Sequence, residues 1–235
     1  KLLNSLSNSK YKDKYIIGTG LNSLGETINI MKVAISLNLK EFLIMPPAFY
    51  KYGDNDVINF YKKIVEAIPE SQIILYNFEK LSGYKFSVEC IKELVRRFPE
   101  QIIGVKDSSY NIYENLKLDN FSILPGSELK LFKGLELGCS GIITATCNVT
   151  AELSRKVYDD FLSEKKQTFN KKLCDVRSVF EKYNLISGLH TYCGRKDKIY
   201  RNLLPPLSML SPQEEKELIE KLSQLNFSTR STTIT

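Results

Sequence analysis

A lysine ends an apolar run in the stretch "IIGVKDSSY", Ile102 to Tyr110. The residues before Lys106 have the composition of a buried strand in a parallel sheet, where an ammonium group is costly to bury. Lys106 therefore reaches solvent, pairs with the neighbouring Asp107, or does chemistry. In an apolar setting the pKa of a lysine falls, and its neutral amine can attack a ketone to form a Schiff base.

A Schiff-base enzyme also needs a group that moves protons on and off the substrate hydroxyl. Tyr76 ends the stretch "QIILYN", which reads as the strand before the one that carries Lys106. A phenol one strand away from the amine is suitably placed for this work. The alternative is that Tyr76 is simply one of 13 tyrosines and caps the core.

These two stretches belong to a repeating pattern. Six short apolar runs, each bounded by Gly, Pro, Asn or Asp, read as parallel strands: residues 15–20, 41–47, 72–77, 102–107, 121–126 and 141–146. The segments between them are amphipathic, and residues 23–38 begin with the helix-capping pair Ser23 and Glu26. The pattern predicts an α/β fold, either doubly wound or closed into a barrel, with functional groups at the carboxyl ends of the strands.

The rest of the chain reads as helix, over residues 150–163, 167–183 and 212–223. Six strands do not complete an eight-stranded barrel, and the opening "KLLNSLSN" resembles the end of a helix, so we expect two βα units to be missing before Lys1. We predict a barrel over residues 1–163, followed by C-terminal helices and a tail over 164–235. The hydroxyl-rich residues 225–235 are expected to be mobile or packed on a neighbouring molecule.

Composition argues against several classes of protein. No apolar run approaches the roughly 18 residues of a membrane span, and the first ten residues lack a signal-peptide core, so we expect a cytoplasmic protein. One histidine and five cysteines without CxxC spacing argue against a metal site and a disulfide framework. The net charge of +6 is spread among acidic residues, which favours a solvated surface over nucleic-acid binding.

Several short motifs resemble one enzyme family when taken in order. They are "GTG" with a glutamate at 26, "PP" at 46–47 followed by aromatics, "YN" with "SG" between 76 and 83, "GVKDSS" at 104–109, "PGSE" at 125–128 and "GCSGIITATCN" at 138–148. The chain resembles the pyruvate-dependent class I aldolases of the dihydrodipicolinate synthase and N-acetylneuraminate lyase family. The ordered combination is specific, although each piece alone is weak.

The resemblance implies a (β/α)8 TIM barrel with a C-terminal helical extension and a homotetramer built from two dimers. It implies that Lys106 forms the Schiff base with pyruvate, that Tyr76 relays protons, and that an aldehyde is the second partner, with no added cofactor. The residues that line the substrate pocket would be Gly126, Ser127, Glu128, Ile143 and Thr144. The family's pyruvate-carboxylate loop has no counterpart in these 235 residues.

Three residues bear on which branch of the family the chain resembles. Leu81 stands where dihydrodipicolinate synthases carry an arginine for a carboxylate, and Phe49 stands where they carry a second relay tyrosine. Leu129 replaces an acidic sugar contact of N-acetylneuraminate lyases. We therefore favour an aldolase acting on a 2-keto-3-deoxy sugar acid or a sialic-acid-like substrate. Dihydrodipicolinate (4-hydroxy-tetrahydrodipicolinate) synthase and a non-catalytic metabolite-binding barrel are the alternatives.

Overall fold

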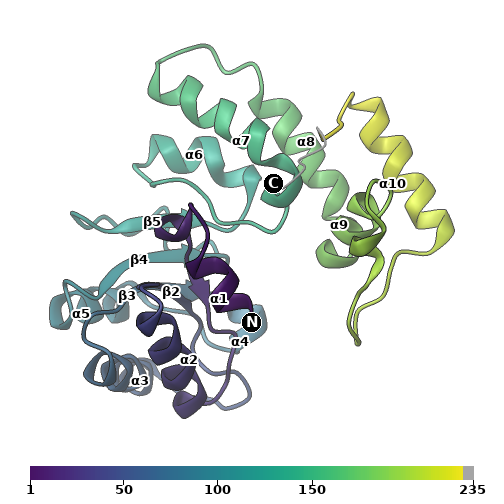
Figure 1. The fold of residues 1–235 in the computed structure, drawn as a ribbon. Helices are drawn as coiled ribbons and strands as arrows, with labels where there is room; N and C mark the ends of the chain where they lie inside the picture. The colour runs from purple at the N-terminus through teal and green to yellow at the C-terminus, as the bar shows by residue number, and fades with distance from the viewer. Residues whose placement is uncertain (230–235) are drawn as a thin grey trace. The chain divides into compact units, whose positions relative to one another are not determined.

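The computed structural model describes residues 1–229, which fall into two compact units (Figure 1). The first unit contains residues 1–126 and 137–140, and the second contains 127–136 and the chain from 141 onward. The predicted boundary between barrel and C-terminal helices at residue 163 stays a prediction. Part of the predicted mobile tail, residues 230–235, lies outside the described residues.

The first unit is built on a parallel sheet. Its strands are β1 (Ile17–Gly18), β2 (Glu41–Ile44), β3 (Gln72–Asn77), β4 (Ile102–Asp107) and β5 (Ser122–Pro125), and they pair in the order β1-β2-β3-β4-β5. A doubly wound sheet reverses its strand order, whereas a barrel adds each strand beside the previous one. The sequential order is therefore typical of a barrel, and five of the six predicted strands are confirmed.

The sixth predicted strand, residues 141–146, does not form. The segment starts at Gly141 with φ of 146°, which is not the backbone conformation of a strand. It then turns at residues 145–146 into a helix, and the hydroxyl groups of Thr144 and Thr146 bind side chains described below. Backbone geometry and side-chain hydrogen bonds thus replace the strand that the apolar composition predicts.

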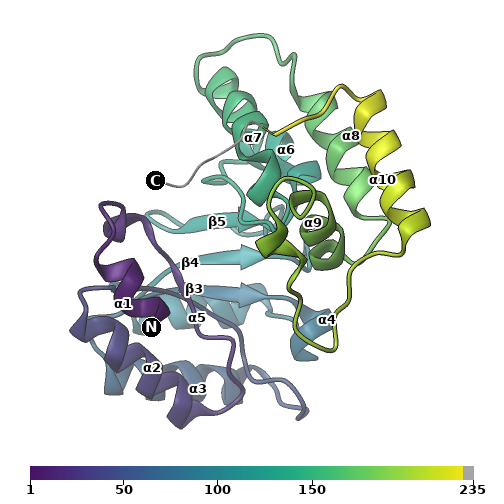
Figure 2. The same cartoon turned by 45° about the vertical axis from the view of Figure 1, so that its right-hand side comes forward.

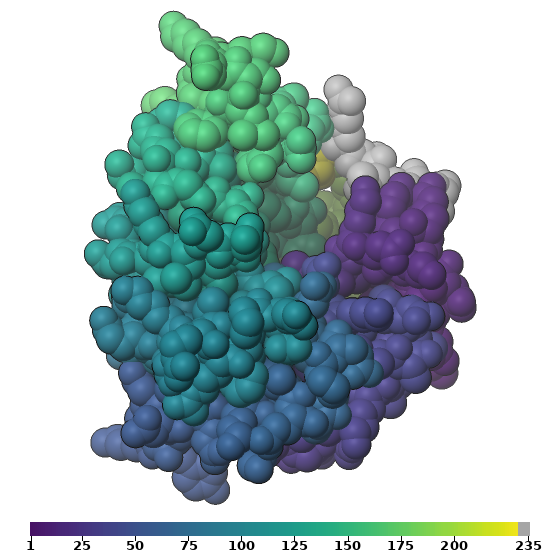
Figure 3. Space-filling view, turned by 90° about the vertical axis from the view of Figure 1, so that its left-hand side faces the viewer, coloured from purple at the N-terminus to yellow at the C-terminus, as the bar shows by residue number. Residues whose placement is uncertain are grey.

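Helices α2 (Leu24–Ser36), α3 (Asp54–Ala67) and α5 (Val88–Arg97) pack side by side on one face of the sheet (Figures 1 and 2). The shorter elements are α1 (Leu2–Ser7), η1 (Lys12–Lys14) and α4 (Glu79–Ser82). The hydroxyl groups of Ser23 and Ser87 accept main-chain hydrogen bonds at the starts of α2 and α5, and the helix start predicted at Ser23 is confirmed. Figure 3 shows one face of the molecule, on which residues 1–126 of this unit run from purple through blue to teal.

The core of the first unit follows from the apolar runs of the strands. Ile73, Ile74 and Leu75 are consecutive in β3 and all buried, as expected for a parallel strand covered on both faces. Tyr61 of α3 is also fully buried, and its hydroxyl donates a 2.7 Å hydrogen bond to the carbonyl of Ile44. The ends of the strands are thereby fixed to the helices that cover the sheet.

The second unit is helical. Its elements are η2 (Glu128–Lys130), α6 (Leu131–Glu136), α7 (Cys147–Leu162), α8 (Asn170–Phe180), α9 (Leu185–Cys193), η3 (Lys198–Arg201) and α10 (Pro212–Gln224). The three predicted helices correspond to α7, α8 and α10, and α10 begins at Ser211 with a capping box that Glu214 completes. Within residues 1–229, no helix is long and apolar enough to span a bilayer.

Candidate active site

Lys106 and Tyr76 lie opposite each other at the carboxyl ends of β4 and β3. The Lys106 Nζ atom is 4.0 Å from the centroid of the Tyr76 ring, within the range of a cation–π contact. Side chains that are paired across adjacent strands point to the same side of the sheet, which explains this contact. The two residues that could do chemistry are therefore brought together by strand pairing.

Burial shifts the titration of both groups. It lowers the pKa of Lys106 from 10.5 to about 8, and burial is the one cause of that shift. At pH 7 roughly a tenth of such an amine is neutral, compared with fewer than about one in a thousand for an ordinary lysine. Burial raises the pKa of the Tyr76 phenol, while a hydrogen bond with the Ser108 hydroxyl lowers it. Tyr76 thus keeps its proton beside an amine that gives its proton up easily.

Of the alternatives considered for Lys106, pairing with Asp107 is not what the structure shows. Consecutive strand residues face opposite sides of a sheet, so Asp107 points away from Lys106 into the core, where it is fully buried. Its carboxylate accepts four hydrogen bonds of 2.8 to 3.0 Å, from the side-chain amide of Asn77 and the main-chain N–H groups of Tyr110, Ile112 and Tyr113. Asp107 therefore fixes the loop after β4 and leaves Lys106 without a neutralising partner in its own motif.

Gly126, a predicted pocket residue, lies directly against the segment that follows Lys106. Its N–H group donates a 2.9 Å hydrogen bond to the carbonyl of Asp107. A Cβ atom at this position would lie 2.2 Å from Ser108 Oγ and 3.1 Å from Ser108 Cα. Only glycine allows the chain after β5 to approach the Lys106 motif this closely, which accounts for the "PG" of the sequence motif.

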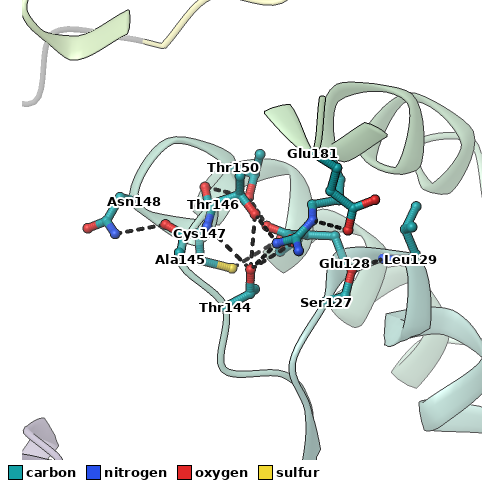
Figure 4. A network of polar contacts seen from close by, with 12 residues as sticks. Ser127, Glu128, Leu129, Thr144, Ala145, Thr146, Cys147, Asn148, Thr150 and Glu181 are labelled. Atoms are coloured by element: carbon teal, nitrogen blue, oxygen red, sulfur yellow. Dashed lines mark hydrogen bonds and ion pairs between the residues drawn. The ribbon is translucent and has the colours of Figure 1, made fainter. Parts of the chain in front are cut away.

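The other predicted pocket residues belong to the second unit, where two of them join a buried polar cluster (Figure 4). Arg177 of α8 bonds through Nη1 to Glu128 Oε2 at 3.2 Å, Thr144 Oγ1 at 2.8 Å and Thr146 Oγ1 at 2.7 Å. Thr150 donates to Glu128 Oε1 at 2.7 Å, and Thr144 donates to Glu128 Oε2 at 2.9 Å. Glu128 is fully buried, so its charge is balanced by Arg177.

This cluster gives Glu128 and Thr144 partners within the protein itself. Ser127 is likewise buried, and its hydroxyl accepts a 3.3 Å hydrogen bond from the N–H group of Leu129 at the start of η2. Ile143 is partly exposed. The substrate contacts of Ser127, Glu128, Ile143 and Thr144 stay predictions.

Arg177 and the roles of Asn77, Thr146 and Thr150 were not predicted from the sequence. One signal was present for Arg177. It occupies a position on the apolar face of α8 defined by Leu173, Val176 and Phe180, at the spacing of successive helical turns. An arginine at such a position is buried and needs a buried acceptor, which here is Glu128.

Comparison with protein-family models decides the family. The model of the dihydrodipicolinate synthetase family matches residues 6–225 of the chain. The chain belongs to this family. The expected family is thus confirmed, and with it the predicted enzyme class, a carbon–carbon lyase of the pyruvate-dependent class I aldolase type.

Curated relatives in the family carry more than one name. The chain is 27% identical over 204 residues to the 2-dehydro-3-deoxy-D-gluconate/2-dehydro-3-deoxy-phosphogluconate aldolase of Picrophilus torridus, covering 83% of this chain and 75% of the relative. It is 30% identical over 143 residues to the 4-hydroxy-tetrahydrodipicolinate synthase of Methanosarcina mazei, covering 58% of this chain and 48% of the relative. The matches thus span from about half to three quarters of the relatives' length.

Solved structures confirm the TIM-barrel fold class. The dihydrodipicolinate synthase of Thermotoga maritima superposes with a TM-score of 0.84 at 19% identity, covering 95% of this chain and 80% of the other. YagE of Escherichia coli K12 in complex with pyruvate gives a TM-score of 0.79 at 22% identity, covering 91% and 75%. At these identities the superpositions show the fold alone.

Proposed function

We propose that the chain carries the Schiff-base site of a pyruvate-dependent aldolase that cleaves a 2-keto-3-deoxy sugar acid or a sialic-acid-like substrate to pyruvate and an aldehyde. The observation that carries the proposal is the partly buried Lys106 amine, 4.0 Å from the Tyr76 ring and with a pKa of about 8. An amine of this kind is a competent nucleophile at neutral pH.

The reaction begins with attack of the neutral Lys106 amine on the ketone carbon of the substrate. The carbinolamine that forms loses water when a proton reaches its hydroxyl, and Tyr76 holds a phenolic proton beside Lys106 for this step. In the resulting protonated imine, loss of the proton on the C4 hydroxyl breaks the C3–C4 bond. The electron pair moves into the imine, the aldehyde leaves, and protonation and hydrolysis of the enamine release pyruvate and the free amine.

Two observations support a sugar acid as the substrate class. Leu81 in α4 is 56% exposed and supplies no cationic fork for a second carboxylate at that place. The relative named as an aldolase of deoxy sugar acids also matches a larger share of this chain than the named synthase does. Both points favour cleavage of a sugar acid over condensation with an acidic semialdehyde.

A second candidate is 4-hydroxy-tetrahydrodipicolinate synthase, which the 30% identity to the Methanosarcina mazei enzyme favours. The two activities share the imine with pyruvate and differ in the aldehyde. Feeding the pyruvate-loaded protein with glyceraldehyde or with aspartate semialdehyde, and identifying the product by mass spectrometry, separates them. In either case we propose a cytoplasmic homotetramer of two dimers, which light scattering of the purified protein tests for its assembly state.

The first test is the intact mass of the protein after incubation with pyruvate and borohydride. The wild type should gain one reduced pyruvate adduct, and Lys106→Ala should gain none. Lys40→Ala is the matched control, because Lys40 is an exposed lysine of the same unit and should leave the adduct unchanged. A wild-type protein that folds and forms no adduct would refute the proposed chemistry and favour a non-catalytic metabolite-binding barrel.

A further inference from the structure

The pairing of β3 with β4 contains an irregularity that decides which residue faces Tyr76. Ile73 lies opposite Ile102, but the next residue, Ile74, lies opposite Gly104. Ile103 is therefore an extra residue in β4, the arrangement of a β-bulge. Had the first register continued, Tyr76 would lie opposite Val105. The bulge is what places Lys106 opposite Tyr76.

The register decides whether the Lys106 amine faces Tyr76 or the opposite side of the sheet. Shifting a strand by one residue moves every side chain to the other face of the sheet. Val105 is fully buried, whereas Lys106 is only partly buried and reaches the Tyr76 ring. In the unshifted register Val105 would face Tyr76, and Lys106 would face the buried side of the sheet. The shifted register must therefore be held firmly at the end of the strands that carries the reactive groups.

The next pair of residues across the two strands, one rung after Tyr76 and Lys106, stabilises the shifted register. Asn77 lies opposite Asp107, both side chains are fully buried, and Asn77 Nδ2 donates a 2.8 Å hydrogen bond to Asp107 Oδ1. The carbonyl of Asn77 also accepts a 2.9 Å hydrogen bond from the N–H group of Ser108. This rung joins the two strands through side chains as well as through the backbone.

Both residues are themselves fixed by neighbouring loops. Asn77 accepts a 3.1 Å hydrogen bond from the N–H group of Phe86 and donates a 2.8 Å bond to Asn111 Oδ1. Asn111 closes the loop by donating to the carbonyl of Phe86 at 2.9 Å. Asp107 receives the three main-chain N–H groups described above. A slip of one residue would break this whole buried network, and buried polar groups without partners are costly.

We propose that Asn77 and Asp107 are positioning residues, whose cross-strand hydrogen bond locks the register made by the bulge at Ile103 and so holds Lys106 against Tyr76. The inference rests on the proposed function for its effect on catalysis. Its structural part, the placement of the Lys106 amine, stands independently of any substrate.

The main variant for testing this is Asp107→Asn. The carboxylate of Asp107 accepts four hydrogen bonds, whereas the new asparagine carries an NH2 group in place of one carboxylate oxygen. That group is a donor and faces other donors, so at least one of the four hydrogen bonds is lost. The matched control is Asp119→Asn, the same chemical change at an exposed residue of the loop that leads to β5. Asn77→Ser is the second variant. It removes the cross-strand bond and leaves Asp107 its three main-chain donors, which keeps the test usable if Asp107→Asn does not fold.

Two measurements are made on variants that circular dichroism shows to be folded. The first is the rate of pyruvate adduct formation with borohydride, which should fall roughly 10- to 100-fold in both variants, with the rate at saturating pyruvate reduced more than the pyruvate concentration for half-maximal rate rises. The second is the pH dependence of acetic anhydride labelling of the Lys106 peptide, from about pH 6 to about pH 11. Its midpoint should rise from near 8 towards that of an ordinary lysine, while Asp119→Asn matches the wild type in both measurements.

The two readouts separate failure of this inference from failure of the proposed function. If the wild type forms no pyruvate adduct, the proposed function fails, and the labelling profile still tests the placement of Lys106. If a folded Asp107→Asn or Asn77→Ser keeps both the wild-type adduct rate and the wild-type labelling midpoint, the positioning role is overturned.

Discussion

Removal of the Arg177 guanidinium should strongly destabilise the second unit. Arg177→Met keeps most of the side-chain volume but leaves the fully buried Glu128 carboxylate without its cation. It also removes the Nη1 contacts to Thr144 at 2.8 Å and Thr146 at 2.7 Å. Breaking one partner of a buried ion pair typically costs about 3–5 kcal/mol. The threonine hydroxyls that remain on Glu128 place our expectation at the low end, about 3 kcal/mol of unfolding free energy.

The double variant Arg177→Met with Glu128→Gln tests whether the lost stability comes from the unpaired charge. Because the loss in the single variant comes from an uncompensated charge, neutralising Glu128 as well should recover part of it, so the double variant is more stable than the sum of the two single effects predicts. A coupling of about 1–3 kcal/mol is expected for such neighbours. Urea unfolding followed by far-UV circular dichroism measures all four proteins under the same conditions.

Arg155→Met is the matched control for this cycle. Arg155 of α7 pairs with Asp159 at 2.7 Å, but their side chains are 68% and 50% exposed. An exposed helix pair of this kind contributes about 0.3–0.5 kcal/mol. If Arg177→Met costs no more than Arg155→Met, or if the single and double variants are simply additive, the buried cluster does not stabilise the unit in the way described.

Three further predictions concern the first unit. Lys106→Met should be more stable than the wild type at pH 7 by up to about 3 kcal/mol, because the pKa of Lys106 is about 8 in the folded protein and about 10.5 in the unfolded chain. This difference in stability should disappear as the pH rises from about 8 to above about 10.5. Urea unfolding at several pH values measures it. Gly126→Ala should cost about 1–3 kcal/mol through its clash with Ser108, and the added change Ser108→Gly should recover most of that loss in a thermal melt. Tyr61→Phe should cost about 1 kcal/mol, because the buried carbonyl of Ile44 loses the hydrogen bond that the Tyr61 hydroxyl donates, and an unchanged urea midpoint would contradict that role.

Local patterns in the sequence predicted much of the first unit. Five apolar runs became parallel strands, and the capping pair Ser23 and Glu26 marked the start of α2. The nearness of Lys106 and Tyr76 also follows from their places next to the last residues of adjacent strands, although their direct contact depends on the bulge at Ile103 as well. These features depend on residues close in sequence or on the general geometry of a parallel sheet, so composition and periodicity are enough to predict them.

The features that were missed depend on partners distant in sequence. Arg177 and Glu128 belong to different helices, and no local pattern links them. The segment 141–146 is as apolar as a strand, but its threonines bind the Arg177 cluster and its first residue breaks the extended backbone. The alternative that Asp107 pairs with Lys106 is excluded for a simpler reason, because neighbours in a strand face opposite sides of the sheet.

The alternation of side chains along a strand explains what the two sequence motifs have in common. In "YN" and in "KD", the first residue faces the side where Lys106 meets Tyr76, and the second faces the core. On the proposal made above, each dipeptide therefore combines a reacting group with the group that holds its strand in register. A bulge between two such strands can set which residues meet only if something fixes the register beyond it, and the buried bond between Asn77 and Asp107 is placed one residue further along for that purpose.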